Sequence, residues 1–556
     1  MIKSITLKFG RAPGIAAEAI QTTPITVFVG PNNSGKSKVL QELNRYCTSG
    51  IVNSTDVIID QVAFESATAE ESQFRVDRVT LRPHHNETVR PEHVIVGKKG
   101  GRTQVHRATL IDFLQNPETN VHAFCSWYLS YNTLILNGRN RIDLVNLQAA
   151  GALQKPATES FQVLLRDNVK RAEVRRIIHE AFGLYLTVDP TGLSHLRLRL
   201  SSRAPNSELE ERGIHEEAVT FHANAQPIDE ASDGVKAFTG MITEIIAGDP
   251  AILLIDEPEA FLHPALSFKL GKEIAHASMG SEKRLFVSTH SPNFVMGCIQ
   301  SGAPVNIVRL TYRNKVATAR LLPSADILRL MRNPLLRSTG VLGGLFYEFV
   351  IVTESDTDRA FYQEINERLL RFKPELGIPN CLFLNAQNKQ TVRMIIRPLR
   401  DLGIPAAGIV DIDVLKEGGA VWTDFLTSGC LPELEKGSLG TLRAAVKEKL
   451  VATGKEMKTD GGLSLLSGSD GEAGNNLFDQ LVQYGLFVVR GGELESWLRP
   501  LNCSGHGPHW LTGIFEHMGE DPEASGYVRP SDGDVWEFIG SIKKWLVDPL
   551  RKGIPN

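Results

Sequence analysis

A glycine-rich loop between an apolar run and a helical pattern restricts the fold of this chain more than any other feature. The loop fits G-x-x-x-x-G-K-[ST] at every constrained position. The apolar run 25–29 precedes it, and Val39, Leu40 and Leu43 follow at helical spacing. The backbone N–H groups of such a loop and the dipole of the following helix bind phosphate groups. The sequence therefore predicts an α/β domain built around a phosphate site.

The loop also predicts ATP and Mg²⁺ as ligands. We expect Lys36 to reach the β- and γ-phosphates and the Ser37 hydroxyl to ligate Mg²⁺. The other candidate nucleotide-binding residues of the loop are Gly30, Asn32, Asn33, Ser34 and Gly35.

A second buried strand is predicted to bring two carboxylates to this site. The run 252–255 is wholly apolar, as in strands of parallel sheets that are buried on both faces, and Asp256 and Glu257 follow it. Ligands bind at the carboxyl ends of such strands. We expect Asp256 to hold Mg²⁺ and Glu257 to orient or deprotonate the attacking water. A third strand, 285–288, precedes His290, which we expect to sense the γ-phosphate.

The C-terminal part of the chain has a separate acidic pattern at the ends of three predicted strands. The candidates are Glu354 and Asp358 after 349–353, Asp411 and Asp413 after 407–410, and Glu495 after 486–489. Gathered carboxylates repel one another unless a cation lies among them. Mg²⁺ or Mn²⁺ with oxygen ligands suits such a set, and two ions would support phosphodiester cleavage. In that case Glu354, Asp411 and Asp413 are catalytic residues as well as metal ligands.

Alternating strand and helix patterns, interrupted by a connection rich in proline and glycine, predict two α/β units that divide near residue 340. We expect an ATPase domain over 1–335 with an irregular and helical insertion at 65–225, a connection at 336–345, and a smaller domain with a C-terminal helical extension over 346–556.

The formal net charge of −4 excludes a globally basic nucleic-acid coat but not a local basic groove. No apolar run approaches a membrane span, and six cysteines without short paired spacing indicate reduced thiols in the cytoplasm.

The N-terminal motifs resemble those of ABC-type ATPase heads, particularly the SMC-like branch and the OLD (overcoming lysogenization defect) family. The resemblance rests on the phosphate loop, on Asp256-Glu257-Pro258-Glu259 with Leu262-His263-Pro264, and on Ser288-Thr289-His290-Ser291-Pro292. It implies that 258–264 is the D-loop, that His290 is the switch histidine, and that Ser232 and Gly234 belong to a degenerate signature motif. It also implies a homodimer or higher oligomer that holds ATP between the phosphate loop of one chain and the signature segment of another.

The C-terminal acidic pattern resembles a Toprim domain, as found after the ATPase in OLD-family nucleases. Glu354 and Asp358 match the first acidic positions, Asp411 and Asp413 the D-x-D, and Glu495 is a candidate for the later acidic position. Ser355 replaces the glycine usual after the first glutamate, and the late lysine has no clear counterpart in the sequence.

Two functions follow from these resemblances. The first is an effector of bacterial antiphage defence, in which an ATPase dimer controls a metal-dependent nuclease in its own Toprim-like domain and acts on nucleic acid. The alternative is a regulatory ATPase whose degenerate Toprim-like domain holds a separate nuclease subunit, as in Septu and retron-associated effector ATPases. A chromosome-maintenance ATPase of the SMC type is disfavoured, because the chain lacks long heptad arms. No membrane partner is expected.

Overall fold

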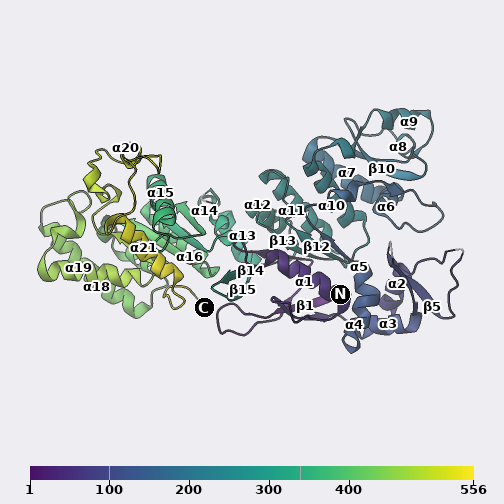
Figure 1. Ribbon diagram of the computed structural model, residues 1–556, viewed down its shortest axis with the longest axis horizontal. Helices are drawn as coiled ribbons and strands as arrows, with labels where there is room; N and C mark the ends of the chain where they lie inside the picture. The colour runs from purple at the N-terminus through teal and green to yellow at the C-terminus, as the bar shows by residue number, and fades with distance from the viewer. Residues whose placement is uncertain (85, 99–100, 339, 556) are drawn as a thin grey trace. The chain divides into compact units, whose positions relative to one another are not determined.

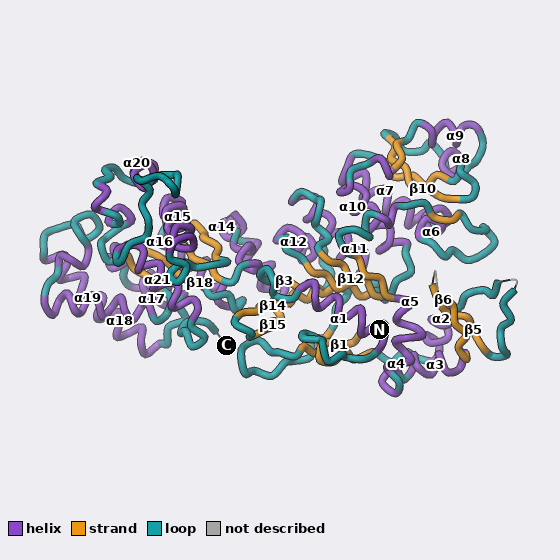
Figure 2. The backbone as a smooth tube through the Cα atoms, viewed as in Figure 1, coloured by secondary structure: helices purple, strands orange, loops and turns teal. Residues whose placement is uncertain are grey.

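The computed structural model describes residues 1–84, 86–98, 101–338 and 340–555. The chain divides into two compact units, Met1–Leu328 and Arg329–Asn556. Each unit contains a sheet with helices packed against it (Figure 1), and strands and helices alternate along much of the chain (Figure 2). Among the described residues, no helix has both the length and the apolar character that a membrane span requires.

The central sheet of the first unit is mixed and has six strands. In spatial order they are β15 (Val316–Leu322), β14 (Val305–Arg313), β3 (Ile25–Val29), β13 (Arg284–Ser288), β12 (Ile252–Asp256) and β7 (Thr133–Leu136). All neighbours are parallel except the β14–β15 hairpin. Every residue of β3 is buried, as expected of a parallel strand covered on both faces. The structure is thus an α/β fold, as the sequence predicts.

Helices cover both faces of this sheet. Those nearest the strand ends are α1 (Lys36–Ser49), α10 (Asp233–Ala247), α11 (Pro264–Ser278) and α12 (Pro292–Gln300). Helix α1 shares a hydrophobic cluster with Phe28, Leu254 and Phe286, and α11 and α12 lie over the other face (Figure 1). The backbones of α11 and α12 approach closely because Gly271 and Gly297 have no side chains where the helices cross.

Smaller sheets surround the central one. They comprise β1 (Ile2–Leu7) between β2 (Ile20–Gln21) and β4 (Ile59–Phe64), the hairpin of β5 (His93–Lys98) and β6 (Gly101–His106), and β8 (Gln148–Ala149), β9 (Tyr185–Asp189), β10 (His195–Ser201) and β11 (Gln226–Pro227). The accompanying helices include α2 (Ala69–Val79), α3 (Arg107–Gln115), α6 (Ser160–Arg166), α7 (Asn168–Phe182), α8 (Glu208–Arg212) and α9 (Glu216–Ala223). The expected insertion at 65–225 contains β7, which pairs with β12 in the central sheet. That stretch is therefore interrupted by one strand of the core.

The second unit has one four-stranded parallel sheet. Its strands, in spatial order, are β17 (Cys381–Asn385), β16 (Phe349–Thr353), β18 (Ala406–Asp411) and β19 (Leu486–Val489). Its helices include α15 (Asp356–Phe372), α16 (Lys389–Asp401), α17 (Gly419–Ser428), α18 (Glu433–Ala452), α19 (Gly468–Val482), α20 (Pro508–Met518) and α21 (Asp534–Val547), and α13 (Ser324–Arg332) and α14 (Pro334–Ser338) precede them. Helices α15, α20 and α21 share a hydrophobic cluster with the sheet, and α16 packs on β18, where Gly408 lies against Ile396.

The contact between α11 and α12 gives a test of the fold. A Cβ at Gly297 would lie 2.0 Å from the carbonyl oxygen of Phe268, so Gly297→Ala must push the two helices apart. We expect a loss of about 1–3 kcal/mol in the free energy of unfolding, measured by urea denaturation. Lys272→Ala, on the exposed side of α11, is the control and is expected to change stability by less than about 0.5 kcal/mol. Equal stability of the two variants would contradict the close helix contact.

Candidate nucleotide site and candidate metal centre

Three parallel strands of the first unit end at the same edge of the sheet. The register pairs Asp256 of β12 with Ser288 of β13, and Ser288 with Phe28 of β3. The phosphate loop follows β3 directly, so this register brings the loop, the carboxylates after β12 and the segment after β13 together. These are the segments in which the sequence places the candidate nucleotide residues.

The lysine and serine of the phosphate loop have distinct contacts. Lys36 Nζ donates to the carbonyl oxygens of Gly30, at 2.9 Å, and Pro31, at 2.7 Å. Burial lowers the pKa of Lys36 to about 8, against the opposing effect of Glu257 and Asp256. The Ser37 hydroxyl donates to Asp256 Oδ1 at 2.8 Å, and the Ser288 hydroxyl donates to the same oxygen. The two predicted Mg²⁺ ligands, Ser37 and Asp256, are therefore in direct contact.

The backbone of the loop depends on glycine at two positions. Gly30 has φ +146°, and a Cβ there would lie 2.1 Å from the carbonyl oxygen of Leu310. Gly35 has φ +96° and precedes α1 directly, so the helix begins at Lys36. Asn33 is also left-handed, at φ 61°, and is exposed together with Asn32, whereas Ser34 is buried. The exposed loop face thus lies next to the uncapped start of α1, which favours anions.

Glu257 lies in a left-handed turn at the end of β12. Its φ is 51°, and its N–H donates to the carbonyl oxygen of Ser288 at 2.8 Å. Its exposed carboxylate lies 3.5 Å from His290 Nε2. Burial, with a further effect of Lys36, lowers the pKa of His290. The backbone N–H of His290 donates to Glu259 Oε1 at 2.6 Å. This hydrogen bond connects the segment after β13 to the predicted D-loop.

Arg141, a candidate for nucleotide contact from its position in the sequence, contacts the backbone of this site. Its buried Nη1 donates to the carbonyl oxygens of Asp256, at 3.2 Å, and Glu257, and its guanidinium lies 5.8 Å from the ring centroid of Phe261. Burial lowers its pKa. The apolar run 134–136 that precedes it belongs to β7, the neighbour of β12. Arg141 therefore fixes the backbone that carries both carboxylates.

Ser232 and Gly234, the predicted signature residues, lie at the start of α10. Ser232 is the N-cap residue, and a Cβ at Gly234 would lie 2.6 Å from the carbonyl oxygen of Phe261. This close approach places the segment against the predicted D-loop of the same chain. Phe261 itself is left-handed, at φ 71°, and 59% exposed.

In the second unit, three predicted acidic residues lie together at the strand ends. Glu354, Asp411 and Asp413 have oxygen atoms within 4.8 Å of one another, and the Asp411 N–H donates to Glu354 Oε1 at 2.9 Å. Burial, with repulsion from Asp411, raises the pKa of Glu354 to about 8, and burial raises that of Asp411 to about 7. Strand β18 includes Asp411 as its last residue, and Asp413 lies in the following 3₁₀ turn.

Two lysines neutralise part of the charge of the acidic pocket, the group formed by Glu354, Asp411 and Asp413. Lys458 Nζ lies 3.0 Å from Asp411 Oδ2 and 3.6 Å from Glu493 Oε2, and Lys389 Nζ lies 2.9 Å from Asp413 Oδ2. Burial alone would lower the pKa of Lys458, but the carboxylates of Asp411, Asp413 and Glu493 together outweigh it and raise the pKa. Lys458 precedes β19 in an irregular segment, so no periodicity in the sequence pointed to it.

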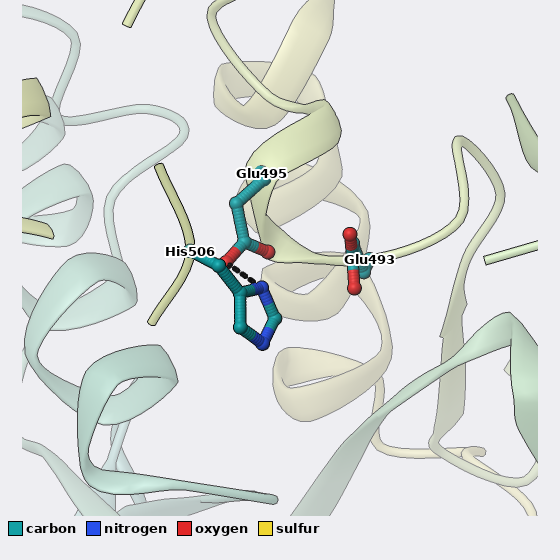
Figure 3. A group of neighbouring side chains, drawn as sticks. All are labelled: Glu493, Glu495 and His506. Atoms are coloured by element: carbon teal, nitrogen blue, oxygen red, sulfur yellow. Dashed lines mark ion pairs between the residues drawn. The ribbon is translucent and has the colours of Figure 1, made fainter. Parts of the chain in front are cut away.

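The remaining acidic candidates lie beside this group. The Asp358 carboxylate accepts the Ser355 N–H at 2.8 Å and caps α15, and burial raises its pKa. Glu495 Oε1 lies 2.8 Å from His506 Nδ1 (Figure 3). Glu493, Glu495 and His506 form a second group with ligand atoms within 4.8 Å of one another. Lys458 bridges this group and the Glu354 group through Glu493 and Asp411.

The donor set of the acidic pocket fits a hard divalent cation. Asp413 Oδ1 is buried without a hydrogen-bond partner among the described residues, and an unpaired buried oxygen is costly. Burial raises the pKa values of Glu354 and Asp411, and repulsion among the gathered carboxylates adds to this effect. Oxygen ligands of this kind suit Mg²⁺ or Mn²⁺, which would supply the missing positive charge.

Comparison with known proteins identifies an ATPase-type segment. The family model described as "AAA domain, putative AbiEii toxin, Type IV TA system" matches residues 154–296, which include Asp256, Glu257 and His290. No curated protein matches the chain. The first unit thus carries an ATPase-type, nucleotide-binding domain, defined by this match and by the geometry of the phosphate loop.

Solved structures similar to the chain include ATPase heads. The SMC head domain from Thermotoga maritima is 12% identical, with 58% of this chain and 99% of that chain covered and a TM-score of 0.28. The Smc head domain bound to the C-terminal domain of ScpA, from Pyrococcus furiosus, is 13% identical, with coverages of 60% and 98% and a TM-score of 0.30. cbiO1 from Clostridium perfringens, part of the ABC transporter complex cbiONQ, is 12% identical, with coverages of 61% and 94% and a TM-score of 0.27.

Arg141 gives a test of this site. Arg141→Lys keeps a positive charge but removes the planar group that reaches two carbonyl oxygens and the Phe261 ring. We expect kcat for ATP hydrolysis to fall about 10- to 100-fold, because Glu257 loses its fixed position, while the Kd of ATP stays within a few-fold. Turnover and equilibrium binding measured on one preparation separate these effects. If ATP binding and turnover fell equally, Arg141 would be shown to hold the nucleotide itself and not the position of Glu257.

Proposed function

We propose that the chain is an ATPase whose nucleotide state controls a metal-dependent phosphodiesterase centre in its second unit. The contact between Ser37 and Asp256, at 2.8 Å, carries the first half of this proposal. It joins the phosphate loop to the carboxylate after β12, which is the arrangement that nucleoside triphosphate hydrolysis with Mg²⁺ requires.

Each residue of the nucleotide site then has a role. Lys36 exchanges its two carbonyl partners for the β- and γ-phosphates of ATP. Ser37 and Asp256 hold Mg²⁺, which neutralises developing charge on the phosphates when it is bound. Glu257 orients or deprotonates the water, and His290, 3.5 Å from it, senses the γ-phosphate.

The active form is proposed to be a homodimer or higher oligomer. Ser232 and Gly234 would complete the nucleotide site of a second chain, as the resemblance to ABC-type heads implies. Support comes from the close packing of Gly234 against the Phe261 carbonyl and from the 59% exposure of Phe261, which leaves the predicted D-loop available for a partner. Hydrolysis of ATP would then release contacts in both chains.

The second unit is proposed to be a Toprim-like domain of the OLD type. Glu354, Asp358, Asp411, Asp413 and Glu495 would hold divalent cations, and nucleic acid would be the substrate. Support comes from the order of these residues at the ends of β16, β18 and β19 and from the unpaired Asp413 oxygen. A role in bacterial antiphage defence follows from the resemblance alone. The proposed cytoplasmic location rests on the cysteine pattern, and the proposed domain boundaries 1–335, 336–345 and 346–556 rest on the composition of the sequence.

The ATPase half is tested by Glu257→Gln. This change keeps the size of the side chain but removes the base, so we expect ATP hydrolysis to fall about 10²- to 10⁴-fold while ATP still binds. The trapped nucleotide should also shift the protein toward the dimer in size-exclusion chromatography with light scattering. Lys36→Ala is the matched control and should lose ATP binding itself. Normal turnover by Glu257→Gln would refute the assigned water-activating residue.

A second candidate function is supported by Lys458. Its ammonium bridges Asp411 and Glu493, and Lys389 pairs with Asp413, so these lysines already compensate part of the charge that a metal ion would neutralise. In this alternative the domain is a docking platform that holds a separate nuclease subunit, as in Septu and retron-associated systems. The ATPase would then regulate that subunit.

Plasmid cleavage with Mg²⁺ or Mn²⁺, with and without ATP, separates the two candidates. If the pocket is catalytic, Asp411→Asn abolishes cleavage, because one cation ligand is lost. Lys458→Met removes the competing ammonium and should tighten metal binding, measured by calorimetry, roughly tenfold or more. Cleavage by the intact chain that survives Asp411→Asn would refute the catalytic assignment. Absence of cleavage in all variants, with activity on adding a partner nuclease, favours the platform.

A further inference from the structure

A cavity of about 360 Å³ lies beside the acidic pocket of the second unit. Its walls come from the turns after β19 and from α20, and include Glu495, Trp497, Arg499, Asn502, Trp510 and Ile514. Sites for small molecules or single nucleotides have volumes of this order and combine apolar walls with a few polar groups. Apart from Glu495, the residues named here belong to neither the nucleotide site nor the carboxylate groups described above.

Two tryptophans make the walls of the cavity flat and rigid. The Trp497 indole N–H donates to the Tyr362 hydroxyl at 3.0 Å, which fixes the orientation of that ring. Trp510 is 1% exposed and packs on Phe361, with ring centroids 5.2 Å apart.

The polar groups of the cavity are also available for a ligand. In the part of the chain that the structure describes, neither the Arg499 guanidinium nor the Asn502 amide makes a side-chain hydrogen bond or ion pair. Glu495 uses Oε1 for both the Gly507 N–H, at 2.8 Å, and His506. Its other oxygen is left for a donor. Donors and acceptors of this kind match the edges of nucleobases, which aromatic side chains bind by stacking.

Glu495 belongs to the cavity and to the carboxylate group at the same time. It lines the cavity wall, and it lies with Glu493 and His506 in a group that suits a divalent cation (Figure 3). An occupant that places a flat, hydrogen-bonding ring in the cavity would therefore carry its anionic part toward the acidic pocket. A nucleotide has this composition, with the base on one side and the phosphodiester on the other.

We propose that this cavity is a base pocket, which receives the base of an unpaired nucleotide whose phosphodiester lies at the acidic pocket. A base in a duplex is stacked and paired and presents no free face to a protein wall, so the pocket selects single-stranded or unpaired nucleic acid. This inference deepens the proposed function, because it names the substrate class of the second unit. It does not depend on cleavage.

The test compares two single strands of the same length in full-length Asp411→Asn protein, one with bases and one with abasic spacers throughout. Asp411→Asn prevents cleavage during the measurement and reduces repulsion of phosphates. Fluorescence anisotropy with Mg²⁺ should show the base-bearing strand bound about 5- to 150-fold more tightly, the range expected for one stacked base. Equal binding of the two strands, or tighter binding of a duplex, overturns the proposal.

Two further substitutions test whether the preference for the base-bearing strand comes from the cavity. Ile514→Trp fills it, and Arg499→Ala removes an exposed side chain without contacts, so the second variant should fold even if the first does not. Both should bring the ratio of the two affinities toward one, whereas Arg371→Ala, a matched arginine on α15, should leave it unchanged. An unchanged ratio in Arg499→Ala and in folded Ile514→Trp overturns the proposal. If the base preference behaves as expected and the wild type never cleaves, the nuclease assignment fails and the base pocket stands.

Discussion

The register of β3, β13 and β12 is the constraint on which the nucleotide site depends. It sets the Ser37 hydroxyl 2.8 Å from Asp256 although 219 residues separate them in the sequence. A slip of one residue would turn every side chain of a strand to the opposite face, and the buried faces of these strands forbid that. The hydrophobic core thus fixes the polar site at its edge.

Local strain at this edge is held by contacts with its neighbours. Glu257 and Phe261 both have left-handed backbones, a conformation that costs non-glycine residues about 1 kcal/mol or more. Arg141 lies against both, through the Glu257 carbonyl and the Phe261 ring. Its loop also contacts α10, because a Cβ at Gly240 would lie 3.1 Å from the Arg141 carbonyl oxygen. The carboxylate end of β12 and the predicted signature helix therefore share one support.

Charge balance governs the second unit in the same way that register governs the first. Buried carboxylates at the strand ends are compensated in part by Lys458 and Lys389, and one Asp413 oxygen is left without a partner among the described residues. A pocket with this excess of negative charge favours a bound cation, and the two lysines limit the affinity for that cation. The basic residues of α16 are largely paired with carboxylates of the same unit. Lys389 pairs with Asp413, Arg393 with Asp424 and Arg397 with Asp401, while Arg400 is wholly buried.

The sequence by itself determined the elements whose signals are local. The phosphate loop, the apolar strands ending in Asp256 and Asp411, and the α/β alternation could be read because spacing and hydrophobicity act over a few residues. Only the tertiary structure decided the contacts of Arg141, Lys458 and His506, and the position of β7 inside the expected insertion. Arg141, Lys458 and His506 lie in loops or irregular segments without periodicity. Their partners are chosen by how distant strands and helices pack, which no local pattern encodes.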